Sequence, residues 1–194
     1  MARPLQIDLD EALKSARVLL WRQGYTATSM SHLLGAMNIG SGSFYAAFGS
    51  KAELFKRVVN DYTEWSMDQF AKVRAHNQGL DAIRLFLEKT LVDISNTGRE
   101  QGCLLVNSVL ELKDVNQELY EYVRDALKQL DSEFRECVDE AQSLGVLSGR
   151  VSEEGAVKLL STQVQGRRVE RRMGLSKTET RQRVSVLMNL MTEN

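Results

Sequence analysis

The chain of 194 residues contains little that would interrupt helices, with one proline in its whole length. A proline inside a helix removes a backbone hydrogen bond, so a chain almost free of it, and rich in Leu, Ala, Glu, Lys, Arg and Gln, favours long helices over strands. The 13 glycines are natural points for those helices to stop. The composition therefore predicts an all-α protein.

Cysteine is also scarce, and long apolar runs are missing. Cys103 and Cys137 follow neither a C-x-x-C spacing nor a disulfide-rich pattern, which favours a reducing compartment. No apolar run approaches the roughly 20 residues that span a bilayer, and the first residues lack the apolar segment of a signal peptide. We expect a cytoplasmic protein without a membrane partner.

Residues for catalysis or metal binding are few. The two histidines, His32 and His76, have no Cys or carboxylate partners at metal-ligand spacing. The sequence contains no G-x-S-x-G, P-loop or H-E-x-x-H motif. We therefore expect neither an enzyme nor a bound metal or cofactor.

Charge is distributed unevenly along a chain whose formal net charge is only -1. Residues 1–57 hold seven Lys or Arg against four Asp or Glu, whereas the remainder holds 18 basic and 22 acidic residues. Such an asymmetry suggests a basic head that meets a polyanion and an acidic body that does not.

Three short helices are expected in the first 50 residues. Asp8 caps a helix over residues 9–23, Thr28 caps a second that ends near Met37, and a third covers residues 41–48. A tight turn at Asn38 separates the second helix from the third, which is the spacing of a helix-turn-helix. The second helix of such a pair enters the major groove of DNA.

The third helix has two contrasting faces. At about 100° per residue, Phe44 and Phe48 point together toward a core, while Gly42 and Ala46 point outward. An outward face without bulk lets a helix backbone approach a groove closely. The alternative is an ordinary short surface helix, whose small residues would carry no function.

Six further helices are expected, which brings the number to about nine. Ser50 opens a long one, and the predicted ranges are residues 50–76, 79–98, 102–112, 114–145, 152–174 and 176–194. No repeat or low-complexity linker interrupts them. We predict a DNA-binding domain over residues 1–50 and a larger helical domain over residues 51–194.

Three stretches of the sequence carry a family resemblance: "TATSMSHLLGAMNIGSGSFYAAFGSKAELF", residues 26–55, "GCLLVNSVLEL" from Gly102 and "QGRRVERRMGLSKTETRQ" from Gln165. The first resembles the DNA-binding motif of the TetR family of transcriptional regulators, and the other two resemble one branch of that family. The resemblance implies an all-helical fold, a ligand-binding body and a dimer formed through the last two helices. It also implies a repressor that binds a palindromic operator and is released by a small molecule.

The resemblance implies a set of DNA contacts. Phosphates would be bound by Thr28, Tyr45 and Lys51, and the bases would lie nearest Asn38, Ser41, Gly42 and Ser43. Many members of the family carry Lys at the position of Ser41 and His at that of Ala46, so the chain lacks two common donors.

Apolar stripes on the last two predicted helices suggest a homodimer, because a single three-helix reader touches too few base pairs for specific recognition. Two subunits could join these stripes in a four-helix bundle. The stripes consist of Val157, Leu160, Val164, Val184, Leu187, Met188 and Met191. The alternative is that they pack only within one chain.

The body should hold a pocket for a small-molecule effector. The candidate lining residues combine helical spacing with apolar bulk or an isolated polar group, and they are Trp65, Phe86, Cys103, Asn107, Phe134 and Gln163. The alternative, which the residue types favour, is that each belongs to the ordinary core. Cys103 could also sense an oxidant or electrophile through its thiol.

A helical adaptor that does not bind DNA is the competing function. Phosphate contacts make DNA affinity fall steeply with salt, so the two functions differ in a simple binding measurement.

Overall fold

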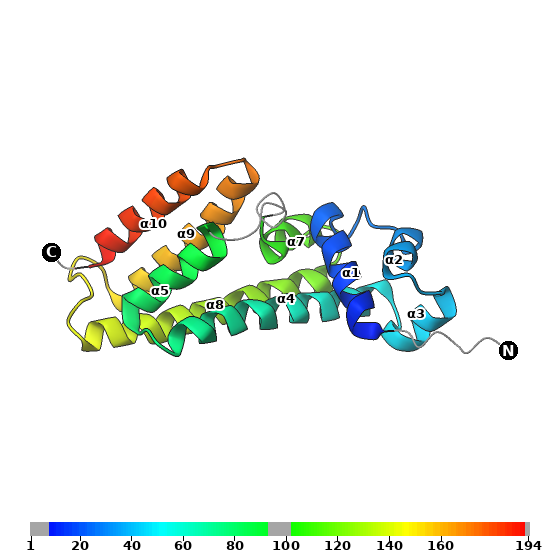
Figure 1. Ribbon diagram of the computed structural model, residues 1–194, viewed down its shortest axis with the longest axis horizontal. Helices are drawn as coiled ribbons and strands as arrows, with labels where there is room; N and C mark the ends of the chain where they lie inside the picture. Colours follow the sequence, from blue (N-terminus) through cyan, green and yellow to red (C-terminus); the bar gives the residue numbers. More distant parts are fainter. Residues whose placement is uncertain (1–7, 93–101, 193–194) are drawn as a thin grey trace.

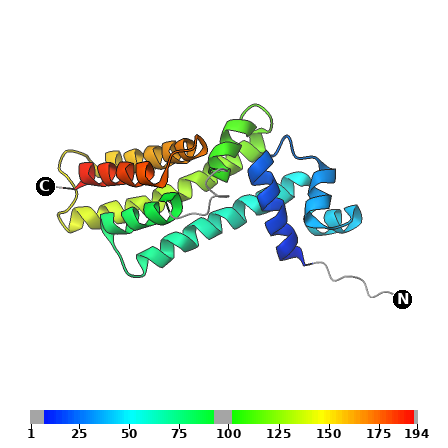
Figure 2. The same cartoon turned by 45° about the horizontal axis from the view of Figure 1, so that its top comes forward.

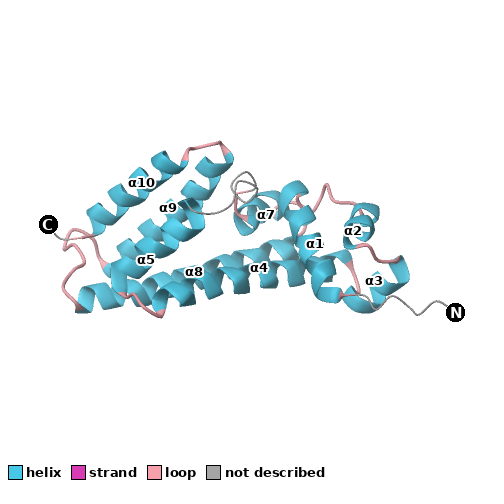
Figure 3. Cartoon of the chain, in the orientation of Figure 1, coloured by secondary structure: helices cyan, strands magenta, loops and turns pink. Residues whose placement is uncertain are grey.

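The computed structural model describes residues 8–92 and 102–192, except for the side chains of four arginines in α9, Arg167, Arg168, Arg171 and Arg172. Within that part the chain is all-helical, apart from one isolated antiparallel bridge between Leu147 and Thr192. Nine α-helices and one π-helical segment follow in order: α1 Leu9–Gln23, α2 Met30–Met37, α3 Ser41–Phe48, α4 Lys51–Arg74, α5 Gly79–Leu87, η1 Glu88–Val92, α7 Leu104–Leu112, α8 Gln117–Ser143, α9 Glu153–Arg172 and α10 Lys177–Met191. The predicted fold class is confirmed (Figure 3).

The molecule is elongated, and its two ends contain different helices. The short helices α1, α2 and α3 form one end, which we call the head, while α5, α9 and α10 form the far end (Figure 1). The long helices α4 and α8 pack against each other and connect the two ends, with α7 lying near the head (Figures 1 and 2). No helix in residues 8–92 or 102–192 is long and apolar enough to cross a membrane.

Side-chain caps fix most helix starts. Asp8 accepts the N–H groups of Asp10 and Glu11 at 3.1 Å, as predicted for α1. Ser50 accepts the Glu53 N–H at 3.1 Å, so α4 begins where the sequence placed it.

Two predicted helix starts are wrong. The cap of α2 is Ser29 instead of Thr28, and the cap of α8 is Asn116 instead of Asp114. The helix predicted for residues 79–98 continues from α5 into η1, and its last six residues lie outside the described part.

Buried apolar side chains form two clusters along the long axis. The head cluster joins α1, α2 and α3 to the first half of α4, to α7 and to the start of α8. The far cluster joins the end of α4 to α5, η1, α9, α10 and the second half of α8. Because α4 and α8 contribute to both clusters, they connect the head mechanically to the far end.

Candidate nucleic-acid interface

The turn between α2 and α3 depends on Asn38. This residue ends α2 in the left-handed region, with φ 52°, a conformation that Asn tolerates better than most residues. The chain then reverses as the Ile39 N–H bonds to the Leu34 carbonyl at 3.2 Å. Asn38 therefore has a structural reason to be present, besides the base contact predicted for it.

Helix α3 presents the two faces that its sequence predicts. Phe44 and Phe48 are buried, with ring centroids 5.6 Å apart, and they anchor α3 in the head cluster. Gly42 and Ala46 are exposed, and the side chain of Tyr45 is 54% exposed. The predicted orientation of α3 is confirmed, whereas its contacts to DNA remain a prediction.

Backbone N–H groups at the start of α3 could receive an anion. Its N-cap is Gly40, which offers no side-chain hydrogen bond to the first turn. The free N–H groups and the positive end of the helix dipole attract phosphate oxygens. Ser41 and Gly42 are exposed there, and Ser43 is half-buried.

Thr28 is not placed to contact a phosphate, which corrects the prediction for its side chain. Thr28 is fully buried, and its hydroxyl donates to the Gly24 carbonyl at 2.6 Å. Ser29 is exposed and accepts the His32 N–H at 3.2 Å, while its hydroxyl lies 2.8 Å from that of Ser31. Two surface hydroxyls therefore occupy the start of α2, where the sequence assigned one to Thr28.

Lys51 lies at the first position of α4, directly after α3. Its ammonium lies 4.3 Å from the centroid of the Tyr25 ring. Burial lowers the pKa of Lys51, and the nearby Glu111 carboxylate opposes that change. The ammonium is half-buried against the head, and its predicted contact with phosphate remains a prediction.

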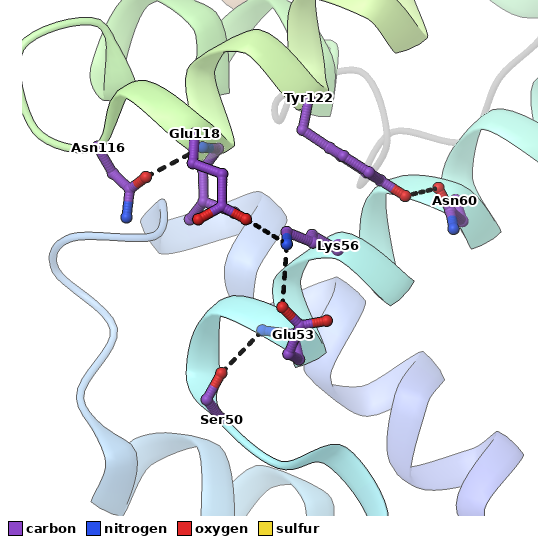
Figure 4. A network of polar contacts seen from close by, with 8 residues as sticks. Ser50, Glu53, Lys56, Asn60, Asn116, Glu118 and Tyr122 are labelled. Carbon is purple, nitrogen blue, oxygen red and sulfur yellow. Dashed lines mark hydrogen bonds and ion pairs between the residues drawn. The ribbon is translucent and has the colours of Figure 1, made fainter.

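Ion pairs and hydrogen bonds connect the head-proximal helices. Arg17 of α1 donates to Asp61 of α4 at 2.6 Å. Lys56 of α4 bonds to Glu53 at 2.9 Å and to Glu118 of α8 at 2.5 Å, and the two glutamates raise the pKa of Lys56 (Figure 4).

The comparisons with known proteins match both parts of this architecture. Residues 12–58 match the family model of bacterial regulatory proteins of the tetR family, and residues 79–185 match the tetracyclin repressor-like C-terminal domain. The chain belongs to the tetR family. Its relatives are transcriptional regulators, a class of proteins that are not enzymes.

Relatives of this tetR-family protein include two regulators of similar length. An uncharacterized HTH-type transcriptional regulator of Bacillus subtilis, YezE, is 27% identical over 81% of each chain. The HTH-type transcriptional repressor ComR of Escherichia coli is 25% identical over 98% of this chain and 92% of its own.

Solved structures support the same fold. The regulator CifR, in a cysteine mutant complexed with operator DNA, has a TM-score of 0.85 at 22% identity, covering 98% of this chain and all of its own. Reduced NemR of Escherichia coli has a TM-score of 0.80 at 17% identity, covering 94% of this chain and 96% of its own. At these identities the likeness shows the fold alone.

The predicted effector residues do not gather in one place in this tetR-family protein. Phe86 and Phe134 are fully buried in the far cluster, where both pack against Phe70. Cys103 is buried in the head cluster, with its sulfur 3.6 Å from the Tyr62 hydroxyl, and Trp65 packs against the same tyrosine.

The other two effector candidates lie apart from these. Asn107 lines a cavity of about 190 Å³ between the end of α1 and α7, and Gln163 is half-buried on α9. The six residues therefore do not behave as the lining of a single site, and an effector pocket remains a prediction.

The seven predicted dimer residues are buried within one chain, which corrects their assignment. They belong to the far cluster and are at most 5% exposed: Val157, Leu160, Val164, Val184, Leu187, Met188 and Met191. Side chains that already fill the core of one subunit cannot form the contact surface for another. The stripes found in the sequence are the inner faces of α9 and α10.

Glu111 of α7 is a functional candidate that no pattern in the sequence selects. Its carboxylate accepts the Tyr25 N–H at 3.0 Å and the Thr26 N–H at 2.5 Å. These partners are 86 and 85 residues away along the chain, so no local spacing could reveal them. Glu111 connects the body to the link between α1 and α2.

Proposed function

We propose that this protein is a homodimeric repressor that binds a palindromic operator through α3 and is released by a small molecule. The observation that supports DNA reading best is the form of α3, which buries Phe44 and Phe48 and leaves Gly42, Ala46 and Tyr45 exposed. A small outward face allows close approach to the major groove, while the Tyr45 hydroxyl and the first N–H groups of α3 supply donors to phosphate.

The proposed DNA contacts are Asn38, Ser41, Gly42, Ser43, Tyr45 and Lys51, with Ser29 taking the role first assigned to Thr28. We assign the phosphate contact to Ser29 because this residue is exposed at the N-cap of α2. Ser41 and Ser43 have short side chains, so base reading would depend on close approach.

Binding to the DNA upstream of the protein's own gene tests this function. We expect affinity to fall at least tenfold between about 50 and 200 mM salt, because phosphate contacts release counterions. Tyr45→Phe should weaken binding by about fivefold on every DNA sequence, the value of one hydrogen bond of about 1 kcal/mol, whereas changes at Ser43 should alter sequence preference.

The matched control is Tyr120→Phe, which removes a hydroxyl from α8 outside the head. It should leave DNA affinity unchanged. If the protein shows no salt-dependent binding, the helical adaptor becomes the better description. If Tyr45→Phe binds as tightly as the unchanged protein, the phosphate contact of Tyr45 is wrong.

The dimer surface is proposed to be the outer face of α9 and α10. Val186 and Leu190 lie one turn apart on α10 and are each 58% exposed, and Val169 on α9 is 43% exposed. Gly166 adds an open position on α9, with nothing within 4 Å of an added Cβ. Exposed apolar side chains beside a small residue allow two helix pairs to approach closely.

Leu190→Lys tests the interface. We expect the unchanged protein to sediment as a dimer at micromolar concentration and the variant as a monomer, since two lysines would meet across the two-fold axis. Asn189→Lys is the control, because Asn189 is exposed toward a cavity between α5 and α10 and should leave the dimer intact. A dimeric Leu190→Lys protein would place the interface elsewhere.

Three further assignments follow from the family. We propose residues 1–50 as the DNA-binding domain and residues 51–194 as the effector-binding and dimerisation domain, although the head cluster crosses this boundary. We also propose the branch of the family that carries the GCLLVN motif, which here leads into α7. A DNA-binding function places the protein in the cytoplasm, where bacterial DNA is accessible.

A further inference from the structure

The Glu111 carboxylate of α7 binds the link between α1 and α2 in the head. Glu111 lies near the end of α7, and both of its oxygens accept backbone N–H groups, from Tyr25 at 3.0 Å and from Thr26 at 2.5 Å. These N–H groups belong to the link between α1 and α2. Hydrogen bonds from backbone N–H groups to an ionised carboxylate are stronger than bonds between neutral groups.

Gly24 makes room for this contact. Its φ of +85° is one that L side chains rarely adopt, and a Cβ at this position would lie 2.7 Å from Glu111 Oε2. A glycine here therefore satisfies both the backbone turn that ends α1 and the close approach of the carboxylate.

The contact continues through Tyr25 to the start of α4. The Tyr25 ring packs edge-on against Phe55 at 5.0 Å and lies under the Lys51 ammonium at 4.3 Å. Helix α3 ends at Phe48 and α4 begins at Lys51. Glu111 therefore contacts the link before α2 directly, and it reaches the segment after α3 through the Tyr25 ring.

The other polar links near the head connect different elements. Arg17 joins α1 to α4 through Asp61, while Lys56 joins α4 to Glu118 of α8. Neither of these links involves α7, which otherwise contacts the head through apolar side chains of the head cluster. The Glu111 contact fixes the orientation of the head relative to α7.

We propose that Glu111 is a positioning residue for operator reading, which fixes the orientation of each head and thereby the spacing between the two heads of the dimer. This inference rests on the proposed function. Two heads bind together only if their separation matches the half-site spacing, about 34–36 Å for readers of this kind. A single head on a single half-site has no such requirement.

Glu111→Gln provides the test because electrostatics and positioning predict opposite signs. The substitution removes a negative charge beside the DNA-binding head, which by charge alone strengthens binding to phosphate. It also places an amide N–H₂ donor against two backbone N–H donors, which breaks at least one of the two hydrogen bonds. Loss of positioning therefore weakens binding where loss of charge would strengthen it.

The first probe is the operator, defined as the sequence that the protein protects in its own upstream DNA. The second is a duplex that carries one half-site. The last two are operators with one base pair added or removed at the centre. We expect Glu111→Gln to weaken operator binding by about tenfold and half-site binding by less than about twofold. The loss of affinity caused by altered spacing should be smaller for Glu111→Gln than for the unchanged protein, because loosely held heads can bind half-sites at several separations.

The matched control is Glu118→Gln, which removes the same charge from the body and leaves the link between α1 and α2 untouched. It should bind the operator at least as tightly as the unchanged protein does, with the same spacing preference. Equal weakening of operator and half-site by Glu111→Gln, stronger binding, or no change would each overturn the inference. Failure of the unchanged protein to bind its own upstream DNA would instead overturn the proposed function.

Discussion

The head end and the far end of the molecule each have an apolar core, but they differ in which elements their polar contacts connect. At the far end, Phe70, Phe86 and Phe134 pack with ring centroids 4.6 to 6.4 Å apart and are fully buried. At the head end, an apolar cluster is also present, and polar contacts join α1 to α4 through Arg17, α4 to α8 through Lys56, and α7 to the link between α1 and α2 through Glu111.

Apolar and polar contacts differ in how easily they can be exchanged. Apolar packing depends on total contact area, so the far end resists any change that opens its core. Directional polar contacts can be exchanged for contacts with water at low cost when they lie near the surface. The polar contacts that join the head to α4 and α7 are therefore easier to exchange than the apolar packing inside either core.

The largest expected effect on Tm comes from removing one large side chain from the far cluster. Phe134→Ala removes a fully buried ring, which typically costs about 3–5 kcal/mol and lowers the Tm of a chain of this size by about 10 °C. Circular dichroism at fixed protein concentration measures the shift. Leu144→Ala, at a site 54% exposed, should change Tm by less than about 2 °C. A small shift in the Tm of Phe134→Ala would show that apolar packing contributes little to the stability of the far end.

An intermediate effect on Tm is expected for the far-end clamp, the name we give to the contacts of the Glu140 carboxylate with Arg74 and with the Gly79 N–H. Arg74 donates to Glu140 at 2.5 Å and the Gly79 N–H donates to the same carboxylate at 2.8 Å, which together lower the pKa of Glu140 below its ordinary 4.5. The carboxylate is partly exposed, so Glu140→Gln should cost about 1 kcal/mol, or about 3 °C in Tm, at pH 7.

The effect of Glu140→Gln should depend on pH in one direction. A lowered pKa means that the charged form stabilises the folded state above the unfolded pKa, and that this stability is lost as pH falls through the folded pKa. The difference between the two proteins should therefore shrink below about pH 4.5. Glu136→Gln, whose carboxylate is more exposed and 3.6 Å from Arg74, is the control and should have little effect. A constant difference down to pH 3 would contradict the clamp.

The smallest effect is expected for the exposed ion pairs near the head. Lys56→Met removes the pairs with Glu53 and Glu118, whose side chains are 56% and 75% exposed. Such pairs are screened by water and salt, so Tm should change by less than about 2 °C. Lys113→Met, on an exposed residue after α7, gives the baseline. A fall as large as that of Phe134→Ala would show that polar contacts stabilise the head as strongly as apolar packing stabilises the far end.

Local patterns predicted much of the fold and part of the site. The spacing of Phe44 and Phe48 was enough to assign the buried face of α3, because a helix turns by a fixed angle per residue. The predictions failed where several residues offered the same local chemistry. Thr28 and Ser29 are both good caps, and only their packing in the folded chain decides which one faces solvent.

The helical class, the helix-turn-helix and the residues that share each helix face could all be predicted from the order of the residues. Tertiary structure decided what covers each face: Met188 faces the core, while Leu190, two residues later, faces solvent. It also brought Glu111 to Tyr25 and Thr26 from 85 and more residues away. Helical periodicity relates residues a few positions apart, whereas a neighbour from a distant helix depends on how the whole chain packs.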